Sequence, residues 1–495
     1  MDAAELSIEG AAPDARYLSE DTRPVPPAQR TWSTRHFALM WTSMSQCIPA
    51  YLLASGLIAV GMNWVQALIT VALANLLVLI PLLLNSHAGT KYGIGFPVYT
   101  RAVFGMRGAH FAGLARGLVA CGWFGIQTWI GGQAIYVIVG QLAGRGWTQA
   151  GRLGDYPWTQ WLCFAVFMLL QLFVVWRGMQ ALRRFEVFAA PLLTLTFAAL
   201  LVWMLIRAGG VGPILSQPSK LGWGAEFWAV FPPSLMSMLA FWATMSLNMP
   251  DFSRFAKNQR AQGLGQALGL PTAMTWISLV SIAVTSASAV VYGAPIWDPV
   301  ELAARFDNPV AVILGLLVAL LGTMSATIAS DVVSPSYVFA NAAPRFIGFR
   351  TGAVIASVIA VVIQPWRLLA DPNIYIYTWL GFYGGLVASV AGVLIAGYWL
   401  LARTELHVPD LFRGAGGRYW YRGGWNWRAV LAAVLAAVLS VGGAYSDPGK
   451  GPFPVDGLIP FLRPLYDYST GIGLVAGLVI AVLLAPPNSR KRGLQ

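Results

Sequence analysis

The sequence predicts an all-α polytopic membrane protein with twelve transmembrane helices, and three observations lead to this fold class. The chain of 495 residues is 57% hydrophobic and only 11% charged, whereas soluble domains carry roughly 25% charged residues. Apolar runs of about 20 residues, which are long enough to span a bilayer as helices, recur along the chain. Lys and Arg are also divided unevenly between alternate loops, as the positive-inside rule describes.

The expected spans follow one another closely along the chain. Residues 1–35 are polar and lack an apolar core, so they are expected to form a disordered cytoplasmic tail and not a signal peptide. Residues 402–427 are expected to form a cytoplasmic loop, and 487–495 a second cytoplasmic tail. We expect the spans at approximately 37–61, 63–86, 110–140, 157–176, 185–206, 227–247, 265–291, 310–341, 352–369, 374–401, 428–444 and 468–486.

The distribution of basic residues sets the orientation. With a cytoplasmic N-terminus, the inside segments hold 23 Lys and Arg residues and the outside loops hold 8. This asymmetry supports the span count and places both termini in the cytoplasm. It also explains the net charge of +12 without a nucleic-acid partner. We expect a multi-pass protein of a bacterial-type inner membrane, present as a monomer in the bilayer.

Composition gives no support for an enzyme. The three cysteines, Cys47, Cys121 and Cys163, all fall within apolar spans and are expected to be free thiols. The four histidines lie at segment ends or in loops, and no metal-ligand cluster or zinc-protease motif is present. A membrane enzyme would need a nucleophile–base or metal set that faces a cavity.

Two spans are interrupted. Span one contains the sequence Ser45–Pro49, and span six contains Pro232-Pro233 followed by Phe241–Thr244. Proline within a span frees backbone carbonyls. The two spans hold corresponding positions in two five-span halves, and broken helices in such positions indicate the binding site of a transporter. Isolated prolines also kink ordinary helices, so this alternative stays open.

The stretch Ala120–Gly132 in span three carries two groups that a lipid-facing helix does not need. Trp123 offers a flat aromatic face, and Gln127 offers amide donors and an acceptor. Four residues apart on a helix, the two side chains project from the same face. A planar ligand with amide edges could stack on one and hydrogen-bond to the other. The alternative is a small-residue packing seam with one satisfied glutamine.

Span eight is unusually polar. Asp331 lies between apolar sequences on both sides, and an intramembrane acid is by default a candidate functional residue. Its alternative role is that of a structural partner for a buried Ser, Thr or Arg. Thr323, Ser325 and Thr327 either bind a cation or bond to carbonyls of their own helix.

Several motifs together resemble the nucleobase–cation symporter-1 family, the permeases for uracil, cytosine, allantoin, hydantoin and related compounds. The resemblance runs from about residue 30 to 485. It is carried by Gly93–Val98, Phe104–Gly108, Ala120–Gly132, Asn248–Arg254, Ser334-Pro335, Tyr398-Trp399 and Gly417–Trp420.

The resemblance implies a LeuT-like fold with a 5+5 inverted repeat and two further C-terminal helices. The ten-helix core would then occupy 36–401, with repeats at about 37–206 and 227–401, and helices 11 and 12 would occupy 428–486.

The resemblance also implies site residues. In the family pattern the substrate ring is held between one Trp of span three and one Trp of span six, positions that fall on Trp123 and Trp242. The span-three Gln falls on Gln127. Gln46 and Phe241, at the two interruptions, are further candidates for substrate contact.

The sequence departs from the family pattern in span eight. The substrate-binding Asn of the family falls on Asp331, and burial in a partly desolvated pocket would favour the protonated form of this acid. The sodium-binding Ser-Thr pair falls on Ser325-Ala326, so one hydroxyl is missing. A sodium site at Ser325 and Gly322 is therefore weakened, and the span-one ligands fall somewhere in 43–46.

These observations predict a secondary-active importer of a small planar nitrogen heterocycle such as uracil, allantoin or a hydantoin. No cofactor is expected apart from the coupling ion, for which a proton is favoured slightly over sodium. The alternatives for the same ligand class are a cation-independent facilitator and a non-transporting membrane receptor.

Overall fold

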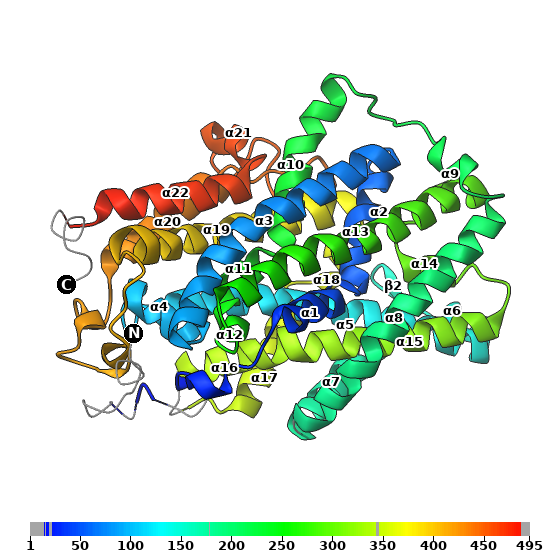
Figure 1. Cartoon of the computed structure of the whole chain (residues 1–495). Helices are drawn as coiled ribbons and strands as arrows, with labels where there is room; N and C mark the ends of the chain where they lie inside the picture. Colours follow the sequence, from blue (N-terminus) through cyan, green and yellow to red (C-terminus); the bar gives the residue numbers. More distant parts are fainter. Residues whose placement is uncertain (1–13, 15, 19–21, 178, 343–345, 487–495) are drawn as a thin grey trace.

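The computed structural model is a bundle of helices with one two-stranded hairpin, and it describes residues 14, 16–18, 22–177, 179–342 and 346–486. Figure 1 shows several long helices, among them α3, α13, α15 and α22, running roughly side by side, while α7 and α8 cross them obliquely. Each of the twelve expected spans coincides with one helix or with consecutive helical segments. The segments are η3 Pro27–Gln29, α1 Thr34–Ser45, α2 Ile48–Ala59, α3 Trp64–Tyr92, α4 Phe96–Phe104, α5 Ala109–Ala143, α6 Arg145–Thr148, β1 Arg152–Leu153, β2 Tyr156–Pro157, α7 Trp158–Arg177, α8 Met179–Arg207, α9 Gly212–Leu215, α10 Ala225–Phe241, α11 Ala243–Asn248, α12 Pro250–Ser253, α13 Gln259–Tyr292, α14 Pro299–Ala303, α15 Pro309–Thr327, η4 Ile328–Val332, α16 Val333–Ala342, α17 Phe349–Val362, α18 Pro365–Leu368, η5 Ile374–Leu380, α19 Gly381–Ile395, η6 Ala396–Leu401, η7 Val408–Phe412, η8 Arg418–Trp420, α20 Trp427–Val441, η9 Pro460–Leu462, α21 Arg463–Tyr466 and α22 Ser469–Leu484.

Among the residues that the structure describes, four helical stretches are long and apolar enough by themselves to cross a bilayer. A fifth is added if the segments Pro460–Tyr466 and Ser469–Leu484, bent by 102°, are taken together. Several other spans fall short of that length because they are divided into shorter segments, as α1 with α2 and α10 with α11 are. The four stretches are Trp64–Tyr92, Trp158–Trp176, Gln259–Tyr292 and Ile374–Leu401.

The first span is broken where the sequence indicates. Helix α1 ends at Ser45, Cys47 is extended, and α2 begins at Ile48. Pro49 lies in the first turn of α2, where a missing N–H leaves no helical hydrogen bond unmade. Polar groups at the break, among them the side chain of Gln46, are consequently available inside the bundle.

The second break does not lie at the prolines of span six. Helix α10 continues through Pro232 and Pro233, and the helix is interrupted at Trp242, whose φ and ψ are −97° and 3°. The Ser237 hydroxyl donates to the carbonyl oxygen of Pro233 at 2.7 Å, which satisfies one of the backbone acceptors near the two prolines. The interruption therefore falls directly beside Phe241, deeper in the bundle than the prolines are.

Three π-helical segments, none of them expected from the sequence, lie in spans eight and ten. Segment η4 contains Asp331, η5 opens span ten, and η6 closes it. A π-helical turn adds a residue to the helical repeat and rotates the side chains that follow, and such turns are frequent at functional sites.

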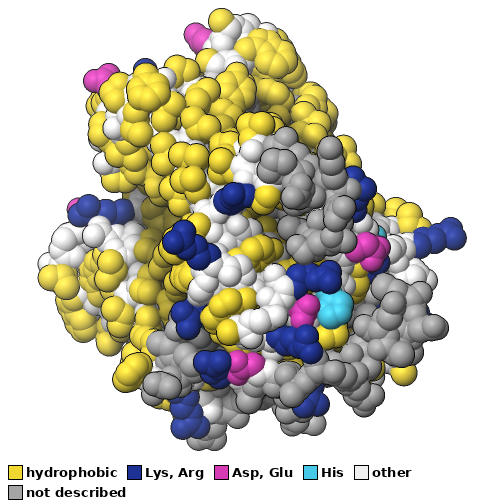
Figure 2. Space-filling view, turned by 90° about the vertical axis from the view of Figure 1, so that its left-hand side faces the viewer, with side chains coloured by type: hydrophobic (Ala, Val, Ile, Leu, Met, Phe, Trp, Pro, Cys, Tyr) yellow, Lys and Arg dark blue, Asp and Glu magenta, His cyan; other side chains and the backbone are white. Residues whose placement is uncertain are grey.

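The two ends of the bundle differ. One end, here called the basic face, carries α4, α12 and residues 402–427, and Figure 2 shows Lys and Arg side chains gathered on it. The other end, here called the opposite face, carries α9, α14 and the hairpin β1–β2. The chain also reaches the opposite face between α20 and α22, because each of these helices crosses the bundle once.

Residues 22–33, part of the expected N-terminal tail, are held against the basic face. The Val25 N–H donates to the Gly93 carbonyl at 2.8 Å, and the Arg30 guanidinium donates to the carbonyls of Val25 and Thr90. Trp32 forms a parallel bridge with Ala256. This segment thus links the start of α1 to the ends of α3 and α12, while residues 1–13 and 487–495 of the expected tails lie outside the described chain.

Candidate functional site

The candidate residues from four spans meet inside the bundle. Trp123 and Gln127 lie in the middle of α5, which packs against α11, α15 and η4. Trp242 lies at the break of span six, and Asp331 lies in η4. Between 5% and 8% of each side chain is exposed, so all four are buried.

The polar part of the site is a side-chain hydrogen bond between two spans. The Gln127 amide nitrogen Nε2 donates to Asp331 Oδ2 at 2.5 Å. The amide oxygen Oε1 of Gln127 is buried without a hydrogen-bond partner in the described structure. The Ser330 side chain also hydrogen-bonds the Asp331 carboxyl group. An unused acceptor and a carboxylate therefore lie side by side, an arrangement suited to N–H donors.

The aromatic part of the site is centred on Phe241. Its ring contacts Trp123 edge-on, with centroids 5.2 Å apart and planes at 88°. It also contacts Trp242, with centroids 4.8 Å apart and planes at 82°. Trp242 lies at the same time against Trp41 of α1. Phe241 is thus the ring shared by the two tryptophans, and neither pair is stacked face to face.

A second set of rings covers Trp123 and was not predicted from the sequence. Trp123 makes edge contacts with Tyr375, Trp379 and Tyr383, at centroid distances of 6.2, 6.1 and 6.1 Å. These three residues of η5 and α19 are called the aromatic roof below. A Cβ atom on Gly122 would lie 2.1 Å from the Trp379 ring, so the roof requires glycine at this position.

Gln46 lies at the break between α1 and α2, and 2% of it is exposed. Its side-chain oxygen is buried without a hydrogen-bond partner among the described residues. No hydrogen bond or ring contact between Gln46 and the four central residues is seen in the described part of the chain. The structure therefore brings Gln46 into the interior but does not join it directly to the pair of Gln127 and Asp331.

Two residues of the expected cation site, Ser325 and Ala326, have side chains that lie outside the described structure. Gly322 packs against α8, since a Cβ atom at this position would lie 2.1 Å from Leu193. The Thr327 hydroxyl donates to the Thr323 carbonyl at 2.5 Å. For Thr327 this matches the simpler of the two expectations, a bond to its own helix.

Arg116 is a buried cation near the site that was not predicted from the sequence. It lies on α5, seven and eleven residues before Trp123 and Gln127, and therefore on the same face of that helix. Its Nε and Nη1 atoms are buried without hydrogen-bond partners in the described structure. Its charge interacts with the carboxylates of Asp251 and Asp331. A clue was its position within an apolar span, where an unpaired charge is costly.

Asp251 links the loop after span six to the start of α4. The Phe96 N–H donates to Asp251 Oδ1 at 2.8 Å, which satisfies a donor at the helix start. Burial raises the pKa of this carboxyl group, which lies in the connection after the span, whereas the Phe96 bond and Arg116 oppose that shift. Asp251 therefore serves the packing of the basic face.

The expectations from the sequence also concern the cysteines and the possible metal ligands of the chain. The three cysteines are buried and free, as expected. No group of three or more His, Cys, Asp or Glu side chains that could hold a metal ion occurs among the residues described. The site is one of aromatic faces, one amide and one carboxyl group, which suits recognition of a neutral planar molecule.

The sequence matches the family of permeases for cytosine/purines, uracil, thiamine and allantoin over residues 24–473. It is 40% identical to a purine-uracil permease of Arabidopsis thaliana over 437 residues, which cover 87% of this chain and 72% of that protein. It is 38% identical to an allantoin permease of Bacillus subtilis over 481 residues, which cover 96% of this chain and 95% of that protein.

Among solved structures, the fold is similar to an inward facing conformation of Mhp1, with a TM-score of 0.78, 24% identity and coverage of 95% and 94% of the two chains. It is also similar to a sodium-coupled sialic acid symporter, with a TM-score of 0.59, 13% identity and coverage of 98% and 96%. At these identities the comparison establishes the LeuT-like fold, in agreement with the expected architecture.

Proposed function

Because the chain belongs to the nucleobase–cation symporter-1 family of permeases, we propose that it is a secondary-active importer of a small planar nitrogen heterocycle. Allantoin and uracil are the first candidates, because relatives over most of this chain are named as allantoin and purine-uracil permeases. The family is one of multi-pass membrane transporters and not of enzymes. The observation that carries the proposal is the buried meeting of Trp123, Phe241, Gln127 and Asp331 between two broken spans.

In this proposal the substrate ring lies against the indole faces of Trp123 and Trp242. Phe241 now contacts both indoles edge-on, so it turns or shifts to admit the ring. The ring N–H groups donate to Gln127 Oε1 and to an oxygen of the Asp331 carboxyl group, and this pairing removes the cost of a buried unpaired acceptor. Gln46 contributes a further amide when span one moves towards the site.

We assign the basic face to the cytoplasm, with both termini on that side of a bacterial-type inner membrane. The gathering of Lys and Arg seen in Figure 2 supports this orientation. Transport then proceeds by alternating access, in which the aromatic roof closes the path towards the outside. The transporter functions as a monomer in this proposal, because the site is built within one chain.

For coupling we favour a proton over sodium. Sodium needs several oxygen ligands, and Ala326 offers none beyond its backbone, while Thr327 bonds to its own helix. Asp331 is a titratable group that accepts a hydrogen bond from the Gln127 amide, which contacts the substrate in this proposal. The nearby Arg116 supplies a fixed positive charge to the same interior. When Asp331 is protonated, its O–H donates to a carbonyl oxygen of the substrate, so the proton and the substrate bind together without a second cation.

The test is uptake of labelled allantoin and uracil by proteoliposomes that contain the purified protein. Accumulation against the substrate gradient, driven by an imposed pH gradient with choline in place of sodium, is the expected result. Uptake that requires sodium and ignores the pH gradient contradicts proton coupling. Equilibration without accumulation under either gradient identifies a cation-independent facilitator, and binding without uptake identifies a receptor.

A further inference from the structure

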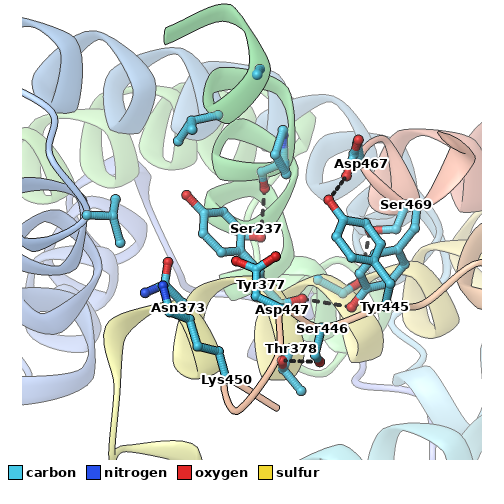
Figure 3. A pocket seen from close by; sticks show the side chains of 16 residues that line it. Ser237, Asn373, Tyr377, Thr378, Tyr445, Ser446, Asp447, Lys450, Asp467 and Ser469 are labelled. Atoms are coloured by element: carbon cyan, nitrogen blue, oxygen red, sulfur yellow. Dashed lines mark hydrogen bonds between the residues drawn. The ribbon is translucent and has the colours of Figure 1, made fainter. Parts of the chain in front are cut away.

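A separate cavity of about 200 Å³ opens on the opposite face. One wall is formed by α10, η5 and α19, and the other by the connection between α20 and α22 (Figure 3). None of the six proposed substrate residues lines it. The outer cavity, as it is called below, therefore lies behind the elements that carry the aromatic roof, and not in the central site.

Four hydroxyl groups that line the outer cavity already donate their hydrogen to an acceptor within the protein. The Tyr445 hydroxyl donates to Asp467 Oδ1 at 2.9 Å. Ser237, Tyr466 and Ser469 donate to backbone carbonyl oxygens at 2.7, 2.7 and 2.9 Å. What these four oxygens still offer is lone pairs, so the polar part of the wall presents several hydrogen-bond acceptors beside the apolar side chains of Val60, Val230 and Pro233.

The acidic side chains of the outer cavity add further hydrogen-bond acceptors. Asp447 at the rim and Asp467 deeper in the wall contribute two carboxylates (Figure 3). Lys450 is the one cation among the described lining residues, it is exposed, and it forms no ion pair with either acid in the described chain. Burial raises the pKa of Asp467, while the bond from Tyr445 and the charge of Arg463 oppose this shift. In the described chain no hydrogen bond is seen at the other oxygen, Oδ2, which can therefore accept from a donor in the cavity.

We propose that the outer cavity binds a compact solute with several N–H donors on one planar centre, as in a ureido or guanidino group. Such a group places donors in several directions at once and matches the acceptors in the polar part of the wall, while its planar faces can lie against the apolar side chains. The volume of about 200 Å³ is below the roughly 300–1,000 Å³ of pockets for drug-sized ligands, so the occupant is small.

The outer cavity shares the segment η5 with the aromatic roof, so a bound solute can affect the position of the roof. Tyr377 and Thr378 of η5 line the outer cavity, whereas Tyr375 and Trp379 of the same segment contact Trp123. A solute bound between η5 and the connection from α20 to α22 joins the two walls and holds the roof closed. Binding itself does not depend on the proposed function, whereas the resulting slower uptake does.

Two kinds of variant test the site. The double variant Asp447→Asn with Asp467→Asn removes both charges but keeps the size of each side chain, and Asp456→Asn is an exposed control on the same connection. Ala229→Phe fills the mouth from an exposed position of α10, and Ala225→Phe, one turn earlier and outside the cavity, is its control.

The measurement is hydrogen–deuterium exchange of the whole protein in nanodiscs with millimolar guanidinium chloride, urea or choline chloride. We expect exchange in residues 374–381 and 445–469 to slow by at least about twofold with guanidinium, and not with choline. The controls should behave as the wild type does. Slowing with guanidinium alone assigns a cationic guanidino ligand, and slowing with urea as well assigns a ligand class that includes neutral ureides.

The proposal is overturned by unchanged exchange with both guanidinium and urea, by equal slowing with choline, or by slowing that persists in both test variants. Labelled-substrate uptake is measured in parallel. Because exchange reports on the outer cavity without substrate, a protein that binds guanidinium but transports nothing would contradict the proposed function and leave this site standing.

Discussion

The hydrogen bond between Gln127 and Asp331 allows a specific test by the substitution Asp331→Asn. Asparagine has nearly the size of aspartate and keeps an oxygen that can accept from Gln127 Nε2, now 2.5 Å from Asp331 Oδ2. Its new amide N–H can turn towards Gln127 Oε1, which has no partner in the described structure. The substitution therefore preserves the shape of the site and removes its charge and its titration.

The expected magnitudes follow from the loss of charge. A hydrogen bond to a charged group contributes about 1.5–3 kcal/mol and a neutral one about 0.5–1.5 kcal/mol, so the difference is on the order of 1 kcal/mol. The free energy of unfolding should fall by about that amount at most. The hydrogen bond between the substrate N–H groups and residue 331 should weaken by a similar free energy, so the Kd should rise about fivefold. The response of uptake to a pH gradient should disappear.

The assay compares uptake by proteoliposomes at several outside pH values with the inside pH held constant. Asp307→Asn is the control, because this carboxylate is 89% exposed on the opposite face and lies 3.7 Å from Arg207. It should leave both the affinity and the pH response unchanged. If Asp331→Asn keeps a pH-driven uptake equal to that of the wild type, Asp331 does not carry the coupling proton and the proposed mechanism is wrong.

Three further predictions concern the rings and the cation. Trp123→Ala and Trp242→Ala should each weaken substrate binding by about 1–3 kcal/mol in tryptophan-quenching or calorimetric titrations, and Phe should be tolerated better because it keeps a ring face. Equal losses with Phe and Ala would contradict stacking. Ala326→Thr restores a hydroxyl and should create a sodium response in choline-replacement uptake assays; its absence would place the cation site elsewhere. Gly122→Ala should push Trp379 aside, since the new Cβ would lie 2.1 Å from its ring, and should slow uptake by holding the roof open. Combining it with Trp379→Leu should restore uptake, and a lack of rescue would indicate general damage to the helix.

The spans were predictable because a helix that crosses the bilayer needs a continuous apolar stretch, whether its side chains face lipid or other helices. The pattern holds for α3 and α13, which are continuous, and for spans one and six, which are interrupted. The exact break in span six was not predictable, because Pro232 and Pro233 are accommodated within α10. Neighbouring hydroxyl groups and packing decide whether a proline interrupts a membrane helix, and neither is visible in a local sequence.

Some residues of the candidate site were predictable from the sequence, and others were not. Trp123 and Gln127 were predictable as neighbours, because helical spacing places residues four apart on one face. Their meeting with Asp331 agrees with the resemblance to the family, although their roles in transport remain predictions. The aromatic roof was not predictable, because Tyr375 and Trp379 read like the interfacial aromatics common at the ends of membrane spans.

The π-helical segment η5 connects the central site to the outer cavity. Its residues alternate between the two, with Tyr375 and Trp379 on Trp123 and with Tyr377 and Thr378 on the cavity. A displacement that withdraws the roof from Trp123 must therefore also change the volume behind it. Tyr466 limits this displacement, because its hydroxyl donates to the Tyr377 carbonyl at 2.7 Å. Opening of the central site towards the opposite face consequently requires either that bond to break or the connection from α20 to α22 to move with η5.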